Sequence, residues 1–252
     1  MREKKKRTAG SILSALSILL FALPLGVFLW LFGLAGKMCG ALRVLHHERM
    51  DCLDWLDKKF VVAPHPSWID PFLVAFVLAW HYVRHPLKHA PLIVADRFNF
   101  YDCWWFWPFR SVMVPIDRDS DRKKAFSLLR IREAVECGRP IIIFPEGGRT
   151  FKGENGKFLY GKKGAKSRIR FLQEGIGFLV AKTGATVIPI GIKGSDEAFP
   201  NSKERLFTKF VPWKRITISV GEPISFPSDT PRGQITQEIA FQILALIDEA
   251  SD

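Results

Sequence analysis

The chain of 252 residues has few cysteines, and no two of them show the short spacing of a zinc site or a redox motif. No grouping of histidine with cysteine has the spacing of metal ligands either. These absences argue against a structural zinc ion and against a disulfide framework, and they fit a reducing compartment. The four cysteines are Cys39, Cys52, Cys103 and Cys137.

Internal repeats and low-complexity tracts are also absent, so the length fits one compact domain with an appendage. Acidic residues are outnumbered, because 25 aspartates and glutamates face 37 lysines and arginines, which gives a formal net charge of +12. This charge predicts an anionic partner, such as nucleic acid, an acidic lipid surface or a phosphorylated substrate. Nucleic acid is disfavoured, because the basic residues are spread over the chain and no nucleic-acid-binding motif accompanies them.

Charge is missing altogether between Ser11 and Gly36, where Leu, Ile, Phe, Val and Trp dominate. An apolar run of this length can cross a bilayer core roughly 30 Å thick. The basic residues 1–7 would also suit a signal peptide, but the run is longer than a typical signal-peptide core and shows no clear cleavage site. We predict that residues 1–48 attach the chain to a membrane and that residues 49–252 form the folded domain.

The same run contains Pro24 and, after it, Gly26, Gly33 and Gly36, which favour an interruption of the helix. Basic residues flank the run on both sides, so the positive-inside rule allows both ends to be cytoplasmic. Two helices with a break between them, dipping into one leaflet, satisfy both observations, and we favour this arrangement over a single tilted span. The predicted location is the cytoplasmic face of a membrane, such as the bacterial inner membrane.

Short apolar segments alternate with longer helical segments in the rest of the chain. The alternation predicts an α/β domain in which a mostly parallel central sheet is flanked by helices, with the apolar N-terminal segment as a membrane-anchoring helical part. A polar helical connector is expected over residues 46–59. The expected strands are residues 60–63, 92–95, 111–116, 140–144, 186–192 and 216–220. The expected helices are residues 72–83, 122–137, 168–182 and 234–249.

Residues 101–109 (Tyr-Asp-Cys-Trp-Trp-Phe-Trp-Pro-Phe) are unusually aromatic. Burial in the core is the ordinary explanation for aromatic side chains, but one helix face cannot bury so many in succession. Trp is favoured at the interface of a membrane with water. A surface that presses into lipid headgroups is therefore the second interpretation.

In residues 65–70 (His-Pro-Ser-Trp-Ile-Asp), a histidine precedes an aspartate by five positions, where an expected strand turns into an expected helix. Asp70 followed by Pro71 fits a helix start, with Asp70 as N-cap. A carboxylate beside an imidazole fixes its tautomer and stabilises the imidazolium, so His65 could deprotonate a hydroxyl. The simpler alternative is structural, because Ser67 and Asp70 also fit a capping box.

Two further expected strands end in charged residues at the same edge of the sheet. One delivers Arg118, and the other delivers Glu146 and then Gly147, Gly148 and Arg149. Glycine lets the backbone approach a ligand closely, and arginine matches a phosphate with two parallel hydrogen bonds. The two arginines and the glycine turn are therefore a candidate phosphate clamp, although each arginine alone could simply be solvated.

These segments resemble, in the same order, the four motifs of the PlsC-like glycerolipid acyltransferases, the family of the lysophosphatidic acid acyltransferases. Residues 65–70 match the first motif, a histidine and an aspartate separated by four residues. Residues 114–118 (Val-Pro-Ile-Asp-Arg) resemble the second motif, and residues 144–150 (Phe-Pro-Glu-Gly-Gly-Arg-Thr) resemble the third. Residues 187–190 (Val-Ile-Pro-Ile) resemble the fourth, and the likeness covers roughly residues 58–225.

The resemblance implies transfer of a fatty acyl group from acyl-CoA or acyl carrier protein to the free hydroxyl of lysophosphatidic acid, which gives phosphatidic acid. His65, oriented by Asp70, would take the proton of the hydroxyl as it attacks the thioester carbonyl. Arg118 and Arg149 would hold the phosphate of the acceptor, and Glu146 would orient the site around Arg149. No metal and no bound cofactor are implied. No acyl-enzyme is required, which agrees with the lack of a GxSxG nucleophile elbow.

The sequence departs from the family pattern at three places. Pro64 replaces the asparagine often found before the motif histidine, Gly148 stands where many members have threonine, and residues 151–167 form an extra basic loop. The loop could be a lid, a contact for the phosphates of acyl-CoA or for a lipid headgroup, or a solvated loop. The acceptor therefore stays open: another lysolipid, an amino-lipid or a glycolipid is the nearest alternative. A catalytically silent lipid-binding relative is the alternative from another class.

Overall fold

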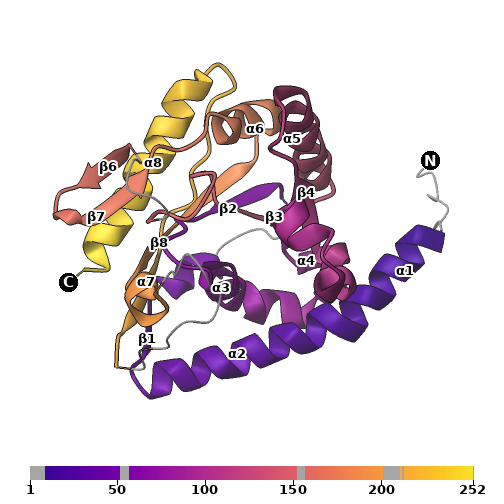
Figure 1. Ribbon diagram of the computed structural model, residues 1–252, viewed down its shortest axis with the longest axis horizontal. Coiled ribbons are helices and arrows are strands. Elements are labelled where there is room, and N and C mark those ends of the chain that lie inside the picture. The colour runs from indigo at the N-terminus through magenta and orange to yellow at the C-terminus, as the bar shows by residue number, and fades with distance from the viewer. Residues whose placement is uncertain (1–8, 52–56, 152–156, 201–210, 212, 252) are drawn as a thin grey trace.

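The structure is a computed structural model, and it describes residues 9–51, 57–151, 157–200, 211 and 213–251. Within these residues, seven strands form a central sheet in the order β1-β9-β8-β2-β5-β3-β4, with helices on both faces (Figure 1). Neighbouring strands are parallel except for β8 and β9. The strands are β1 (Leu42–Leu45), β2 (Lys59–Val62), β3 (Leu92–Asp96), β4 (Met113–Ile116), β5 (Ile141–Ile143), β8 (Thr186–Lys193) and β9 (Ile216–Val220).

The prediction of a mostly parallel α/β sheet flanked by helices is confirmed. All six expected strands form, although β4 begins at Met113 because residues 104–112 are a 3₁₀ helix. β1 was not expected, and it places the start of the sheet inside residues 1–48. In the expected connector, the described residues hold only a short 3₁₀ helix, η2 (His47–Met50). The main helices of the domain are α3 (Asp70–Arg84), α5 (Asp121–Glu136), α6 (Gly175–Thr183) and α8 (Arg232–Glu249), with the short α4 (Pro86–His89) and α7 (Ser195–Ala198).

Part of the extra basic loop is an antiparallel hairpin of β6 (Phe158–Gly161) and β7 (Gly164–Arg170). The prediction of a helix over residues 168–182 is therefore wrong before α6, because Ser167 and Ile169 are both buried in the alternating pattern of a strand. The hairpin packs on α8, where Asp248 accepts the backbone N–H groups of Lys162 and Lys163 at 2.7 and 3.0 Å.

One continuous helical segment occupies residues 9–38, as α1 (Ala9–Ser17), the π-helical turn η1 (Ile18–Ala22) and α2 (Leu23–Met38). Pro24 lies in the first turn of α2, directly after the π-helical turn. A wider turn before a proline accommodates its missing N–H and its bulky ring. The expected break is therefore absent, and residues 12–38 form a helix long and apolar enough, by length and composition, to cross a membrane.

The glycines of α2 serve packing rather than interruption. A Cβ atom at Gly26 would overlap the Tyr82 ring, and one at Gly33 would overlap the Phe76 ring. Both rings belong to α3, so glycine lets α3 lie close against the backbone of α2, as Figure 1 shows. The other side of the N-terminal segment exposes large apolar side chains, namely Ile12, Leu13, Leu16, Leu20, Phe28, Leu31 and Phe32.

Buried apolar side chains form one core on each face of the sheet. The first core lies between the sheet and helices α5, α6 and α8, and the second lies between the sheet and α3. The central strand β2 serves both, since Phe60 and Val62 face the first core and Val61 faces the second. The catalytic candidates lie at the edge of the sheet between these two faces.

Candidate active site

The predicted site residues gather at one edge of the sheet. His65 follows β2, Glu146 follows β5 and Arg118 follows β4. These strands run parallel to one another, so their carboxyl ends lie at the same edge. The segments that the sequence singled out are therefore brought together by the topology.

His65 and Asp70 contact each other directly. Nδ1 of His65 lies 3.1 Å from Oδ2 of Asp70, and the same oxygen accepts the backbone N–H of Ser67 at 2.6 Å. α3 begins at Asp70 with Ile69 as its N-cap, one residue earlier than expected. Asp70 therefore accepts from the chain that enters the helix and contacts the imidazole, whereas Ile69 takes the N-cap position that the sequence predicted for Asp70. With Asp70 ionised, Nδ1 is the donor and Nε2 keeps a lone pair that can accept a proton.

The two members of this pair differ in their access to solvent. The Asp70 side chain is fully buried, whereas 21% of the His65 side chain is exposed. Burial raises the pKa of the Asp70 carboxyl, and the contacts with His65 and with the backbone N–H of Ser67 act against this shift. The His65 ring also packs on Phe144, with 4.7 Å between ring centroids. A histidine held by a buried carboxylate and still reachable from outside can act as a general base.

Glu146 holds the backbone around His65. Its Oε1 accepts the backbone N–H of His65 and the hydroxyl of Thr150, both at 2.8 Å, and its Oε2 accepts the backbone N–H of Arg170 at 3.0 Å. Thr150 in turn donates its backbone N–H to the His65 carbonyl at 2.8 Å. Burial of the side chain raises the pKa of the Glu146 carboxyl. Glu146 therefore fixes the main chain of the histidine, whereas the sequence reasoning connected it with Arg149.

The turn after Glu146 approaches Arg118. Gly147 has a φ of 74°, which glycine adopts without strain, and a Cβ at Gly148 would meet nothing within 4 Å. Arg118 donates from Nη1 to the Gly147 carbonyl, and Arg149 is half-buried at the end of the same turn. The structure thus places Arg118 against the glycine turn next to the His65 segment, and Arg149 follows this turn in the chain.

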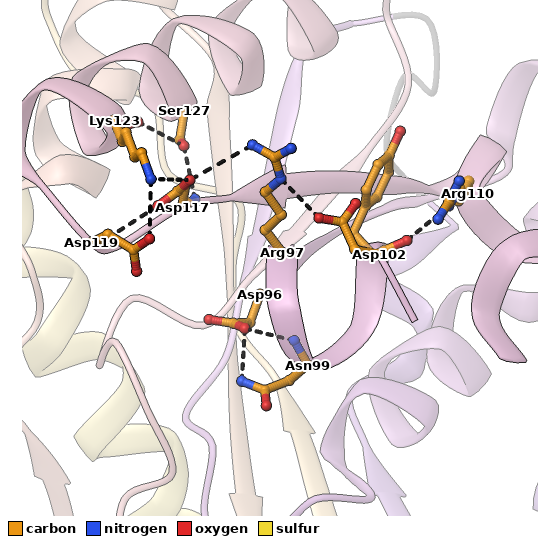
Figure 2. A network of polar contacts seen from close by, with 10 residues as sticks. Asp96, Arg97, Asn99, Asp102, Arg110, Asp117, Asp119, Lys123 and Ser127 are labelled. Carbon is orange, nitrogen blue, oxygen red and sulfur yellow. Dashed lines mark hydrogen bonds and ion pairs between the residues drawn. The ribbon is translucent and has the colours of Figure 1, made fainter. Parts of the chain in front are cut away.

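A network of charged side chains holds the loop that carries Arg118 (Figure 2). Asp117 is buried, and its Oδ2 lies 3.7 Å from Nη1 of Arg97 and 3.5 Å from Nζ of Lys123. Arg97 also pairs with Asp102 at 2.9 Å, in the segment of aromatic residues. The charge of the Asp117 carboxylate is therefore balanced by two cationic side chains, and these ion pairs stabilise the loop of its neighbour Arg118.

The aromatic segment lies on the surface rather than in the core. It forms the π-helical turn η3 (Arg97–Tyr101) and the 3₁₀ helix η4 (Trp104–Val112). It adjoins the N-terminal helix, since the Ser17 hydroxyl donates to the Pro108 carbonyl at 2.7 Å. Its exposed rings thus continue the apolar surface of α1 and α2. The most exposed of them are those of Trp104, Trp105 and Trp107, at 69%, 68% and 60%.

The sequence did not predict two residues that contact the side chains of the candidate site. Thr150 and Phe144 stand inside the third motif, but their spacing gave no hint that one bonds to Glu146 and the other packs on the imidazole. Cys39, Cys103 and Cys137 are free thiols, and Cys52 lies outside the described residues. Among the residues that the structure describes, no three side chains of His, Cys, Asp or Glu are grouped so that they could hold a metal ion.

The mostly parallel sheet and its flanking helices form a fold that a solved structure shares. The crystal structure of the 1-acyl-sn-glycerophosphate (LPA) acyltransferase PlsC from Thermotoga maritima has this fold, with a TM-score of 0.62. The comparison covers 100% of this chain and 84% of that chain, at 16% sequence identity. The model of the Acyltransferase family matches residues 54–193, which is more than half of the chain. The chain belongs to the acyltransferase family.

Curated relatives match shorter segments. The chloroplastic 1-acyl-sn-glycerol-3-phosphate acyltransferase of Brassica napus is 34% identical over 92 residues, which is 36% of this chain and 23% of that protein. A protein of the same name from Chlamydomonas reinhardtii is 29% identical over 150 residues, 59% of this chain and 38% of its own length. Another, from Helicobacter pylori, is 49% identical over 55 residues, 21% of this chain and 22% of its own length. These matches each span well under half of the relatives they concern.

Proposed function

We propose that the protein transfers a fatty acyl group from a thioester donor, acyl-CoA or acyl carrier protein, to the free hydroxyl of lysophosphatidic acid. The observation that carries this proposal is the contact of 3.1 Å between Nδ1 of His65 and the buried carboxylate of Asp70. The names of the relatives, all 1-acyl-sn-glycerol-3-phosphate acyltransferases, support the choice of acceptor.

In this mechanism Asp70 holds Nδ1 of the imidazole, so that Nε2 takes the proton of the acceptor hydroxyl. The hydroxyl oxygen attacks the thioester carbonyl and forms a tetrahedral intermediate. The carbon–sulfur bond then breaks, the new ester is released, and the departing thiolate receives the proton from Nε2. Histidine and carboxylate return to their starting states, and no covalent acyl-enzyme forms.

The phosphate of the acceptor would lie between Arg118, Arg149 and the Gly147-Gly148 turn. Arg118 and the turn already touch, and the open space at Gly148 leaves room beside the backbone. The charged network around Asp117 keeps the loop of Arg118 in place (Figure 2). A phosphate bound there would be close to the His65 segment, as the short spacing between phosphate and free hydroxyl in lysophosphatidic acid requires.

The acceptor assignment can be tested with Arg118→Ala and Arg149→Ala, with acceptor and donor concentrations varied separately. A charge-assisted hydrogen bond to phosphate is worth about 1.5–3 kcal/mol, so each substitution should raise KM for lysophosphatidic acid roughly ten- to a hundredfold. Lysine at either position should restore only part of the loss, because it lacks the planar fork. Arg122→Ala, at an exposed position on α5, is the matched control. Unchanged acceptor kinetics in both alanine variants would show that the acceptor needs no phosphate.

We further propose that the protein acts at a membrane, on its cytoplasmic face, and that the N-terminal part supplies the attachment. One side of α2 packs on α3, so the opposite apolar side is free to enter lipid. The exposed tryptophans of η4 adjoin this surface, and Trp favours the headgroup region. This arrangement suits a helix that lies along the membrane interface.

A further inference from the structure

A cavity of about 320 Å³ lies beside the catalytic segment, on the side of β2 that faces β8 and away from Arg118. Pro64 and Pro66, the two chain neighbours of His65, form part of its wall. The carboxyl end of β8, the short helix α7, the hairpin strand β7 and the end of α8 contribute further, together with Thr150 and Phe151 after β5. Its volume is at the lower end of the range of ligand pockets, which is roughly 300–1,000 Å³.

Arg168 of β7 lines this cavity without an acidic partner among the described residues. Its guanidinium lies over the Phe151 ring at 5.1 Å and over the Phe158 ring at 5.0 Å. Its Nε is buried and has no hydrogen-bond partner in the described part of the chain. Aromatic rings hold a guanidinium in place without neutralising its charge. The other N–H groups of the guanidinium also make no hydrogen bond to the described residues, so they are open to an anionic ligand.

The other charged side chains of the wall are Glu197, Lys193 and Asp196. Glu197 pairs with Lys214 at 2.7 Å. Lys193 also has a partner. Burial raises the pKa of the Asp196 carboxyl, and the charge of Lys193 acts against this rise. Within the described wall, Arg168 is therefore the cationic side chain that lacks a hydrogen-bond or ion-pair partner. A single anionic group fits this cavity better than a cation does.

We propose that the cavity binds the phosphate of the phosphopantetheine arm of the acyl donor, with Arg168 as its ligand. This inference rests on the proposed function, which gives the phosphate of the acceptor to Arg118 and Arg149. The hairpin packs with α8 on the face of the sheet opposite α2, so it lies away from the proposed membrane surface (Figure 1). A water-soluble donor approaches from that side. CoA and acyl carrier protein share this phosphate, and the flexible pantetheine arm leads from it to the thioester at His65.

The test compares three donors that carry the same acyl chain: acyl-CoA, acyl carrier protein, and acyl-pantetheine, which lacks the phosphate. Full-length wild-type protein is measured beside Arg168→Gln and Arg168→Lys. Lys162→Gln is the matched control, because it removes one positive charge from an exposed position of the same hairpin. Arg168→Gln should lower kcat/KM for acyl-CoA and for acyl carrier protein roughly ten- to a hundredfold. Acyl-pantetheine and the acceptor KM should be unaffected. Arg168→Lys should recover part of the loss, and Lys162→Gln should stay within about threefold of wild type.

Calorimetric titration with CoA and with pantetheine gives a second measurement that needs no turnover. The Kd for CoA should weaken by the same factor in Arg168→Gln, while the Kd for pantetheine should not change. A wild-type protein that never acylates lysophosphatidic acid would contradict the proposed function, and the titration would still decide the donor site. An equal loss with acyl-pantetheine, a raised acceptor KM or an unchanged Kd for CoA would each overturn the assignment of Arg168 to the donor phosphate.

Discussion

The two faces of the sheet are covered by layers of different character, although the cores beneath them are equally apolar. On one face, α5 turns charged residues such as Arg122 and Lys124 to the outside. On the other face, α2 lies outside α3 and exposes Phe28, Leu31 and Phe32. A helix that is apolar on both sides needs a second apolar environment beyond the protein. The difference supports the proposal that one face meets water and the other meets lipid, with His65 at the edge where a soluble donor and a lipid acceptor would meet.

Removal of the base at this edge has the largest expected effect. His65→Ala should abolish acyl transfer to lysophosphatidic acid, because no other group is held by Asp70 to take the hydroxyl proton. The fold should survive, since 21% of the His65 side chain is exposed and its backbone N–H still bonds to Glu146. Asp70→Asn should lower kcat somewhat less, on the order of the 10⁴-fold loss seen for the orienting carboxylate of serine proteases. Near-normal turnover in His65→Ala, with circular dichroism unchanged, would refute the mechanism.

The proposed difference between the two faces can be tested by replacing exposed apolar residues of the N-terminal helical segment with polar ones. Leu20→Gln with Phe28→Gln should weaken binding to anionic phospholipid vesicles at least about a hundredfold, because each side chain contributes about 1.5–3 kcal/mol when buried in lipid. Phe126→Gln with Phe241→Gln is the matched control, because these rings are exposed to a similar degree on the other face. Flotation with vesicles measures both pairs. Equal losses in the two pairs would mean that the two faces do not differ in their partner.

Much of this arrangement follows from the sequence alone. The apolar runs before His65 and Glu146 predict buried parallel strands, and parallel strands bring their carboxyl ends to one edge. The role of the glycines in α2 could not be predicted, because it depends on Tyr82 and Phe76 of a helix that follows much later in the chain. A glycine and a proline in an apolar run look like a break until the packing partner is known.

For related reasons, the sequence could not predict the hairpin of β6 and β7 or the hydrogen bonds of Glu146. In β7 the alternation of buried Ser167 and Ile169 is masked by Arg168 and Arg170, the basic residues that alternate with them. Glu146 bonds to the backbone N–H of His65, a group that every residue except proline possesses, so no side-chain pattern could indicate the contact. The sequence therefore indicated which residues gather at this edge of the sheet, Glu146 included, but not the main-chain hydrogen bonds that Glu146 accepts.

The variant Glu146→Gln tests the comparison between the two faces at His65 itself. Asp70, on the α3 face, contacts the imidazole, whereas Glu146 connects the backbone of the same histidine to the hairpin on the other face. Glu146 accepts the backbone N–H groups of His65 and Arg170. In the glutamine variant, the side-chain NH₂ group would face one of these N–H groups, so that two donors oppose each other. The free energy of unfolding should fall by about 1–3 kcal/mol. The kcat should fall roughly ten- to a hundredfold, because the base loses its exact position. Glu133→Gln, at an exposed position of α5, is the control in both measurements, and an equal response in that variant would remove the special role of Glu146.

The smallest expected effect concerns the pH dependence of stability on the side of the sheet that α3 covers. Burial lowers the pKa of His81 on α3 from 6.5 to about 4, and Asp51, at 3.4 Å, opposes this shift while His47, His89 and Arg84 add to it. Because the folded pKa lies below the unfolded one, the unfolded chain takes up the proton first as the pH falls. The stabilisation is therefore present above pH 6.5 and is lost progressively toward pH 4.

Between pH 7 and pH 5, His81 should account for a loss of about 2 kcal/mol in the free energy of unfolding. Urea titrations of the detergent-solubilised protein at the two pH values measure this loss. His81→Asn should reduce the difference between the two pH values by that amount, because asparagine does not titrate. His85→Asn, which removes an exposed histidine at the end of the same helix, should leave the difference as in wild type. If both variants lose the same acid sensitivity, the effect belongs to the general charge of this face and not to the buried ring of His81.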